Sequence, residues 1–179
     1  LVEKIVRRAC SLIGVNNAFV HLLNADESAL EVAVSIGIFV QMHESAPAAV
    51  KPGQGLVGRV WECGHMLTVD DYSTWPGRQP WAYKELRSLT IVPLLIGATV
   101  VGTLGVAFID PDRRLAQDEV DALQRFAQLA SIALDNAKLY EQSKATEALL
   151  QQRVAERTNE LDRMLSIANN LSSTFDIDV

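Results

Sequence analysis

The sequence predicts an α+β fold, in which a sheet of short antiparallel strands has helices at both ends and continues into a long C-terminal helix. Three observations support this prediction. Apolar residues recur at helical spacing over residues 2–13, and they alternate with other residues over 30–36. All 10 Gly and all 6 Pro lie at or before Pro111. The chain is therefore predicted to join a turn-rich globular part to an almost uninterrupted helix.

The first elements are predicted to be a helix and a hairpin. The helix over residues 2–13 is followed by Gly14, a residue type that commonly ends helices. Residues 17–23 are predicted to form a strand, 24–28 a polar turn and 30–36 a half-buried strand. Because the chain opens inside the helical pattern, we expect its natural start to lie upstream.

The middle of the globular part is predicted to be less regular. Residues 37–52 are expected to be irregular, whereas 56–63 can form a short helix that Gly64 closes. Residues 66–69 are predicted to form a short strand. Residues 71–87 are expected to be a long aromatic-rich connection that contains one helical turn.

Two apolar strands and a final helix complete the prediction. The strands cover 88–96 and 99–109 and meet at a Gly-Ala turn. The helix is expected over 116–173, with Asp118 and Glu119 in its first turn, where acidic side chains suit the helix dipole.

The final helix carries part of a heptad pattern. The a positions are Phe126, Ala133, Tyr140, Glu147, Val154, Leu161 and Ala168. The d positions are Leu129, Asn136, Ser143, Leu150, Arg157, Met164 and Leu171. Polar residues in such a seam weaken a coiled coil and set its register. We predict a homodimer through this helix; the alternative is a single amphipathic helix that packs on its own domain and then frays.

Composition and charge argue against some classes of binding partner for this chain. The formal net charge is −6, and no cluster of Lys and Arg offers a basic patch, so neither nucleic acid nor a membrane surface is expected as a partner. No segment approaches the ~20 apolar residues of a membrane span. Cys10 and Cys63 have neither metal-ligand nor disulfide spacing, and we expect both to be reduced, buried thiols of a cytoplasmic protein.

One glycine motif suggests a nucleotide site, but its context does not. Residues 53–58 match G-x-G-x-x-G, which binds dinucleotides only after a buried strand and before a long crossover helix. Pro47 and Pro52 interrupt the lead-in, and Gly64 leaves little room for the helix. We therefore expect these glycines to let the backbone turn tightly into a short helix.

The polar residues predict no catalytic, metal or cofactor site. His21, His43 and His65 lack partners at metal-ligand spacing and are expected to be surface or hydrogen-bonded structural residues. For His43, in a loop able to cover a pocket, the alternative is a lone axial haem ligand. Asp71, just before Tyr72, is expected to fix the following turn through side-chain to backbone hydrogen bonds.

The most informative local feature is aromatic density. Only 6% of the residues are aromatic, yet Tyr72, Trp75, Trp81 and Tyr83 fall within one predicted loop. Two indoles in an exposed loop are costly unless they cover something. They either roof the core of the sheet or line a ligand pocket, and the sequence favours neither alternative.

Several segments in a fixed order resemble the GAF family of small-molecule sensor domains. They are residues 51–60, 63–64, 69–72, 86–88 with 92–94, 101–106 and 127–140. The resemblance covers about residues 1–140. It implies a central antiparallel sheet with helices on both sides, and a pocket between the sheet and residues 37–87.

Departures from the family pattern reduce the range of ligands and activities that the resemblance implies. Residues 108–114 lack the Asn-Lys part of the cyclic-nucleotide signature, so no cyclic nucleotide is expected. Residues 71–87 contain no Cys to attach a bilin covalently. The related sulfoxide reductases need several cysteines around the pocket, and this chain has only Cys10 and Cys63.

The resemblance leads to a prediction of domains and function. Residues 1–140 are predicted to be a sensory domain. Residues 153–161 resemble linkers of bacterial sensor histidine kinases, and residues 161–179 resemble the lead-in helix of another GAF domain. Residues 141–179 are therefore predicted to be a linker or coiled-coil helix that leads into a further, truncated module. We expect a regulatory sensor rather than an enzyme, and the alternative is a ligand-free structural dimerisation module. A small molecule is expected to contact Phe39, Val57, Tyr72, Trp75, Trp81 and Tyr83, with hydroxyls from Ser88 and Thr90.

Overall fold

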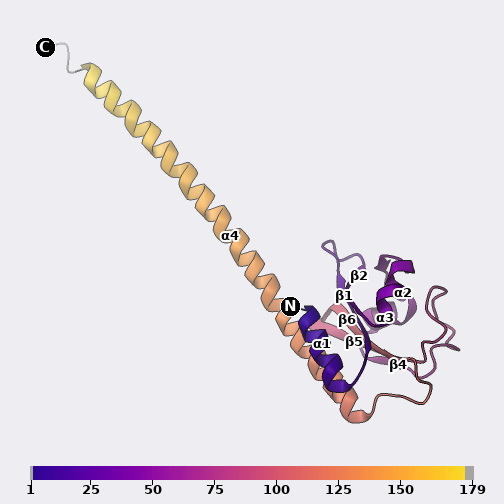
Figure 1. Ribbon diagram of the computed structural model, residues 1–179. Helices are drawn as coiled ribbons and strands as arrows, with labels where there is room; N and C mark the ends of the chain where they lie inside the picture. The colour runs from indigo at the N-terminus through magenta and orange to yellow at the C-terminus, as the bar shows by residue number, and fades with distance from the viewer. Residues whose placement is uncertain (1, 176–179) are drawn as a thin grey trace. The chain divides into compact units, whose positions relative to one another are not determined.

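The computed structural model describes residues 2–175, and side chains are described within them except at Leu12 and from residue 165 onward. The elements are α1 (Val2–Ile13), β1 (Asn17–Leu23), β2 (Leu30–Ile36), α2 (Phe39–Ser45), β3 (Ala49–Val50), α3 (Gly55–Cys63), β4 (Leu67–Val69), β5 (Ser88–Ile96), β6 (Thr99–Phe108) and α4 (Gln117–Phe175). Figure 1 shows these elements along the chain.

The strands form one antiparallel sheet in the order β3-β2-β1-β6-β5-β4. The two hairpins, β1–β2 and β5–β6, are joined in the centre, where β1 pairs with β6. β4 is short and pairs only with the first half of β5. The predicted α+β class and the antiparallel sheet are therefore confirmed.

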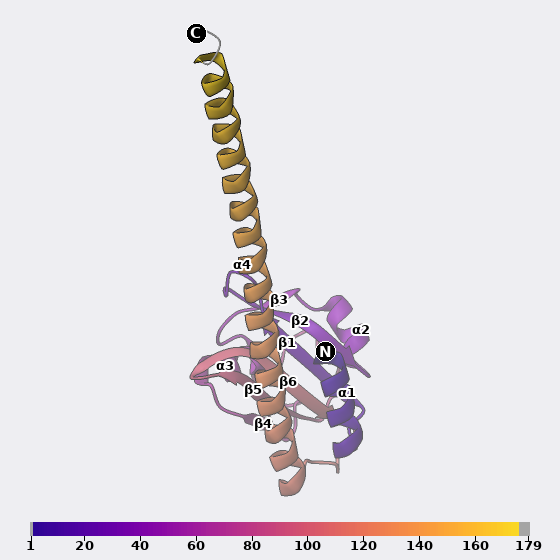
Figure 2. The ribbon, with the colours of Figure 1, turned by 90° about the vertical axis from the view of Figure 1, so that its left-hand side faces the viewer.

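Helices cover both faces of the sheet, as the resemblance implied. One face is covered by α1 and the first turns of α4, which Figure 2 shows side by side against the sheet. The apolar side chains buried there include Val6, Ile13, Val92, Leu104 and Leu123. The opposite face is covered by α2, α3 and the long connection between β4 and β5.

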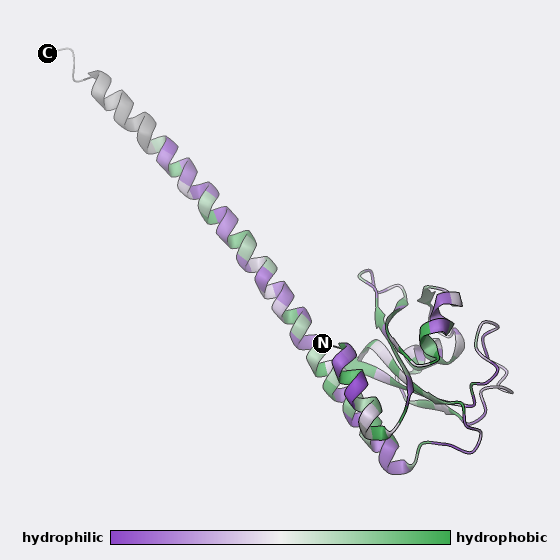
Figure 3. Cartoon of the chain, in the orientation of Figure 1, coloured by the Kyte–Doolittle hydropathy of each residue, from purple (hydrophilic) through white to green (hydrophobic). Residues whose placement is uncertain are grey.

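The chain divides into two compact units, residues 1–135 and 136–179, and α4 contributes to both. The sequence placed this boundary at residue 140. In the second unit the helix exposes large apolar side chains at several of the predicted seam positions. These are Tyr140, Leu150, Val154, Leu161 and Met164. Figure 3 shows hydrophobic turns alternating with hydrophilic ones along this helix.

The prediction for residues 37–52 is wrong, because this segment contains α2 and β3. No side chain caps α2 at its N-terminus, so the local sequence gives little sign of a helix. The helix is instead stabilised by tertiary packing, since Phe39 and Met42 are buried against the sheet. The connection 70–87 consists of turns, and the helical turn expected there does not form.

The glycine motif turns the chain as predicted. Gly53 has φ of 74° and Gly55 has φ of 62°, and α3 begins directly at the second of them. The expectation for the cysteines is half wrong, because Cys10 is buried but Cys63, the last residue of α3, is exposed. Within the described chain, no helix is long and apolar enough to cross a membrane.

Candidate functional site

A small cavity of about 40 Å³ lies between the sheet and the segments that cover its second face. Its floor comes from β1 and β5, and its roof from α2, α3 and the connection between β4 and β5. The residues that line it are Phe19, His21, Phe39, Met42, His43, Pro47, Ala49, Val50, Gln54, Gly55, Leu56, Val57, Tyr72, Gln79, Trp81, Leu86 and Leu89. None of these residues is Asp, Glu, Lys or Arg, so the wall is mostly apolar and carries no fixed ionic group.

Phe19 sets the floor of the cavity because a glycine lies opposite it on β6. Phe19 pairs with Gly105, and a Cβ atom at Gly105 would lie 2.2 Å from Cζ of the Phe19 ring. The ring can therefore lie flat over β6 only while residue 105 has no side chain. It then meets Phe39 edge to face, with 4.6 Å between ring centroids.

His21 is the unusual polar group of the floor. It is 3% exposed, and its Nδ1 atom has no hydrogen-bond partner among the described residues. Burial is the main cause, and the neighbouring His43 a smaller one, that together lower the pKa of His21 from 6.5 to about 3. His21 is therefore a neutral imidazole with an unsatisfied nitrogen next to a cavity, an arrangement that costs folding free energy.

His43 faces His21 from α2. Their ring centroids lie 5.3 Å apart with an interplanar angle of 84°. Nδ1 of His43 lies 2.6 Å from Oγ of Ser35 on β2, and its ring stacks on Phe39. Burial lowers the pKa of His43 to about 4. Both histidines are thus neutral near pH 7.

The expectation for the histidines needs correction. His65 is exposed, as predicted, but His21 is neither on the surface nor hydrogen-bonded at Nδ1. Sequence spacing could not bring His21 and His43 together, because they lie on different elements that only the fold places face to face. A cavity of about 40 Å³ also has no room for a haem beside His43.

We refer to α2, α3 and residues 70–87, which lie over the cavity, as the cover. Some aromatic residues of the cover line the cavity and others do not. Tyr72 and Trp81 line the cavity, as do Phe39 and Val57 among the predicted ligand contacts. Trp75 instead packs on Tyr72 at 5.4 Å between ring centroids, and the guanidinium of Arg59 lies over the Trp75 ring, 5.1 Å from its centroid.

Of the predicted ligand contacts, Trp75 and Tyr83 do not line the cavity. Tyr83 donates from its hydroxyl to Oε1 of Gln41, at 3.4 Å. Trp75 and Tyr83 therefore belong to the rim of the cover. Asp71 fixes the turn, because the Ser73 N–H donates to its carboxylate at 3.0 Å.

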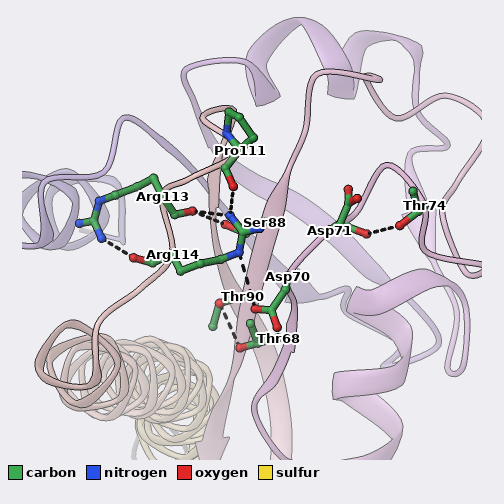
Figure 4. A network of polar contacts seen from close by, with 9 residues as sticks. All are labelled: Thr68, Asp70, Asp71, Thr74, Ser88, Thr90, Pro111, Arg113 and Arg114. Atoms are coloured by element: carbon green, nitrogen blue, oxygen red, sulfur yellow. Dashed lines mark hydrogen bonds and ion pairs between the residues drawn. The ribbon is translucent and has the colours of Figure 1, made fainter.

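The expectation that Ser88 and Thr90 offer hydroxyls to the pocket is wrong. Leu89 and Ile91 of β5 pack on the cavity side, so the alternating residues point to the other face. There the Ser88 hydroxyl donates to the Arg113 carbonyl at 3.3 Å, and Thr90 meets Thr68 at 3.1 Å (Figure 4). The periodicity was predicted correctly, but nothing in the sequence showed which face carried the pocket.

A polar network joins the base of the cover to the start of α4. The backbone of Tyr72 donates to the Arg87 carbonyl, and the Arg87 N–H donates to the Phe108 carbonyl at 2.9 Å. Beyond β6, the guanidinium of Arg114 donates to the Pro111 carbonyl at 2.6 Å and lies 3.9 Å from the Asp70 carboxylate (Figure 4).

The last member of this network is a charged pair at the first turn of α4. The guanidinium of Arg113 bonds both carboxylate oxygens of Glu119. The same carboxylate accepts the Ala116 N–H at 2.8 Å, so it also caps the helix. Hydrogen bonding to Arg113 lowers the pKa of Glu119, and hydrogen bonding to Ala116 acts in the same direction.

A sheet covered on one face by the two terminal helices, with a cavity under the other cover, matches a known family. The sequence model described as "GAF domain" matches residues 1–135. This chain belongs to the GAF domain family. The circadian input-output histidine kinase CikA of Synechococcus elongatus is 32% identical over 127 residues, which cover 66% of this chain and 17% of the kinase. The chain thus spans about a sixth of the length of that relative.

Several solved structures share the fold. The GAF domain of a phosphoenolpyruvate-protein phosphotransferase from Coxiella burnetii superposes with a TM-score of 0.67, at 14% identity, over 78% of this chain and 83% of that one. The free methionine-R-sulfoxide reductase of Neisseria meningitidis gives a TM-score of 0.62, at 20% identity, over 78% of each chain. At these identities the likeness concerns the fold alone. The family relationship and the kinase relatives together identify a regulatory type of domain found in signalling proteins.

Proposed function

We propose that the first unit of the chain, which is the GAF domain, senses a small molecule bound in the cavity. We further propose that α4 relays the bound state to an output domain through a parallel dimer. The observation that carries the sensing proposal is the buried His21 Nδ1 atom, which lacks a partner among the described residues and lies at the wall of a mostly apolar cavity. Pockets for small molecules are mostly apolar with a few placed polar groups, and this cavity has that composition.

A regulatory role fits the cavity better than a catalytic one. Ser35 and His43 are within hydrogen-bond distance, but a pKa of about 4 leaves His43 a weak base at neutral pH. No carboxylate among the described residues lines the cavity to orient that imidazole. We therefore propose binding without chemistry.

The sensing proposal is tested by a thermal-shift screen of small molecules against the whole chain. A ligand that binds only the folded state raises the melting temperature with concentration, because it stabilises that state by mass action. A filler at the cavity, such as Leu89→Phe, should abolish the shift while the protein stays folded. Shifts that survive this substitution would locate the ligand elsewhere.

The alternative is a structural dimerisation module without a ligand. The small cavity volume favours it, since about 40 Å³ is well below the ~300–1,000 Å³ of ordinary ligand pockets. A broad screen without a single shift, combined with an intact dimer, would decide for this alternative.

The dimer is proposed from the exposed apolar side chains of the second unit. Leu150 is 56% exposed and occupies a seam position, whereas its neighbour Leu149 is 51% exposed and lies outside the seam. Leu150→Glu should therefore weaken association, and Leu149→Glu serves as a matched control that should not. Sedimentation equilibrium of both variants, and of a chain truncated after Tyr140, measures the effect. A monomeric wild-type chain, or equal effects of the two substitutions, would contradict the proposed seam.

A further inference from the structure

The wall of the cavity limits the chemistry of what can bind there. Its lining is built mainly from aromatic and aliphatic side chains, and its polar side chains are two histidines, two glutamines and Tyr72. The Tyr72 hydroxyl is hydrogen-bonded to the Gln79 backbone. Both glutamines already have partners, because Gln54 accepts the Lys51 N–H and Gln79 donates to the Gly77 carbonyl. His43 is held by Ser35. Nδ1 of His21 is the lining polar atom that is buried and without a partner in the described chain.

A charged ligand does not suit this wall. None of the lining residues is Asp, Glu, Lys or Arg, so a buried carboxylate, phosphate or ammonium would have no opposite charge. An anion could recruit a charge only by protonating a histidine. The pKa values of about 3 for His21 and about 4 for His43 oppose that protonation at neutral pH.

We infer that the ligand is an uncharged molecule with an apolar body and one hydroxyl group, which hydrogen-bonds to Nδ1 of His21. This inference rests on the proposed sensing function. A neutral imidazole presents either a donor or an acceptor at Nδ1, depending on its tautomer, and a hydroxyl complements both. The aromatic rings of Phe19 and Phe39 contact the body of the ligand.

The size of the cavity requires the cover to move. A cavity of about 40 Å³ holds only a few water-sized atoms, and an engineered apolar cavity that takes up benzene measures about 150 Å³. Trp81 is the large aromatic side chain of the lining that can give way, because it is only partly buried and belongs to the turn-rich connection, whereas Phe19, Phe39 and Tyr72 are buried. A ring-sized ligand therefore enters by displacing this indole.

Three probes of similar size separate the contributions. Phenol carries the hydroxyl, toluene has nearly the same shape without it, and benzoate carries a charge. Calorimetric titration of the whole chain at pH 7 should show phenol binding roughly tenfold more tightly than toluene, the effect of about one hydrogen bond. Toluene is the more apolar of the two, so burial alone would give the opposite order. Benzoate should bind most weakly.

Two variants test whether Nδ1 of His21 causes the preference for phenol over toluene. His21→Phe keeps a ring on the floor but removes the nitrogen, so toluene should still bind and the preference for phenol should disappear. His65→Phe, which changes an exposed histidine that does not line the cavity, should leave the preference unchanged. If His21→Phe does not fold, nitrogen chemical shifts in the wild-type protein replace it. Phenol should then move the His21 imidazole resonances, and toluene should not.

The outcomes separate this inference from the function on which it rests. Equal binding of phenol and toluene, or a preference for phenol that survives His21→Phe, would refute the proposed hydrogen bond between a ligand hydroxyl and His21. The proposed sensing function of the cavity would still stand. Tighter binding of benzoate would overturn the uncharged ligand class. Binding of none of the three probes, with no shift in the wider screen, would overturn both.

Discussion

The buried histidine of the cavity makes the stability of the first unit depend on pH in a defined direction. The pKa of His21 is about 3 in the folded protein and 6.5 in an unfolded chain, mainly because burial disfavours the charged imidazole. Above pH 6.5 both states are neutral and the folded state keeps its full stability. Between pH 6.5 and 3 the unfolded state binds a proton that the folded state does not, so stability falls as the pH falls.

The size of the effect follows from these two pKa values. At pH 5 the unfolded imidazole is almost fully protonated, whereas the folded one is almost fully neutral. Integrating the proton difference from pH 7 to pH 5 gives a loss of about 2 kcal/mol from His21 alone. His43 adds a change of the same sign, because burial also lowers its pKa.

Urea unfolding at pH 7, 6 and 5, at one protein concentration, measures this loss. All 3 tryptophans, Trp61, Trp75 and Trp81, lie in the first unit, so their fluorescence reports on its unfolding. His21→Phe should flatten the pH dependence by about 2 kcal/mol over that range, because the groups common to both proteins cancel in the difference. His65→Phe, which removes an exposed histidine that does not line the cavity, is the matched control for the loss of a histidine. Equal slopes for the wild type and His21→Phe would show that the folded protein protonates or solvates this imidazole.

Three further substitutions test the packing and the network. Gly105→Ala should destabilise by ~1–3 kcal/mol, as overpacking does, because the new Cβ forces the Phe19 ring to move; urea unfolding without a loss would contradict the close contact. Trp75→Ala should cost less than the ~3–5 kcal/mol of a fully buried aromatic, because its ring lies at the rim; calorimetry checks this value. Glu119→Gln should lower the melting temperature more than Glu3→Gln, whose exposed ion pair contributes little.

Most of the fold could be predicted because local pattern and tertiary structure agree over the hairpins. The alternation in β2 and the glycine stop after α1 are local signals, and the structure uses both as expected. α2 could not be predicted, because its stability comes from two buried side chains on a short helix without a side-chain cap. Burial of this kind depends on which face of the sheet lies below, and local sequence does not contain that information.

The candidate site could be predicted only in part for the same reason. Tyr72 and Trp81 were found from aromatic density, since a local cluster of costly exposed rings needs a surface to cover. Ser88 and Thr90 were assigned to the correct alternation but the wrong face. His21 and His43 were set aside because a pair formed across β1 and α2 leaves no spacing in the sequence. The signal available was a single histidine between apolar residues of a buried strand, whose polar nitrogens have to be satisfied by something.

The proposed relay requires that the ligand distinguish two arrangements of the cover, because binding energy shared equally by both shifts nothing. A ligand that displaces Trp81 meets this requirement, since the closed arrangement excludes it by volume. The connection that carries Trp81 is anchored at its base through the bonds of Arg87 to both Tyr72 and Phe108. Immediately beyond Phe108, the residues that follow β6 hold the first turn of α4 through Glu119. We therefore propose that movement of the cover and movement of that turn act on the same strand ends. Under this proposal, linkage predicts that a change that loosens the turn also changes the affinity of the cavity.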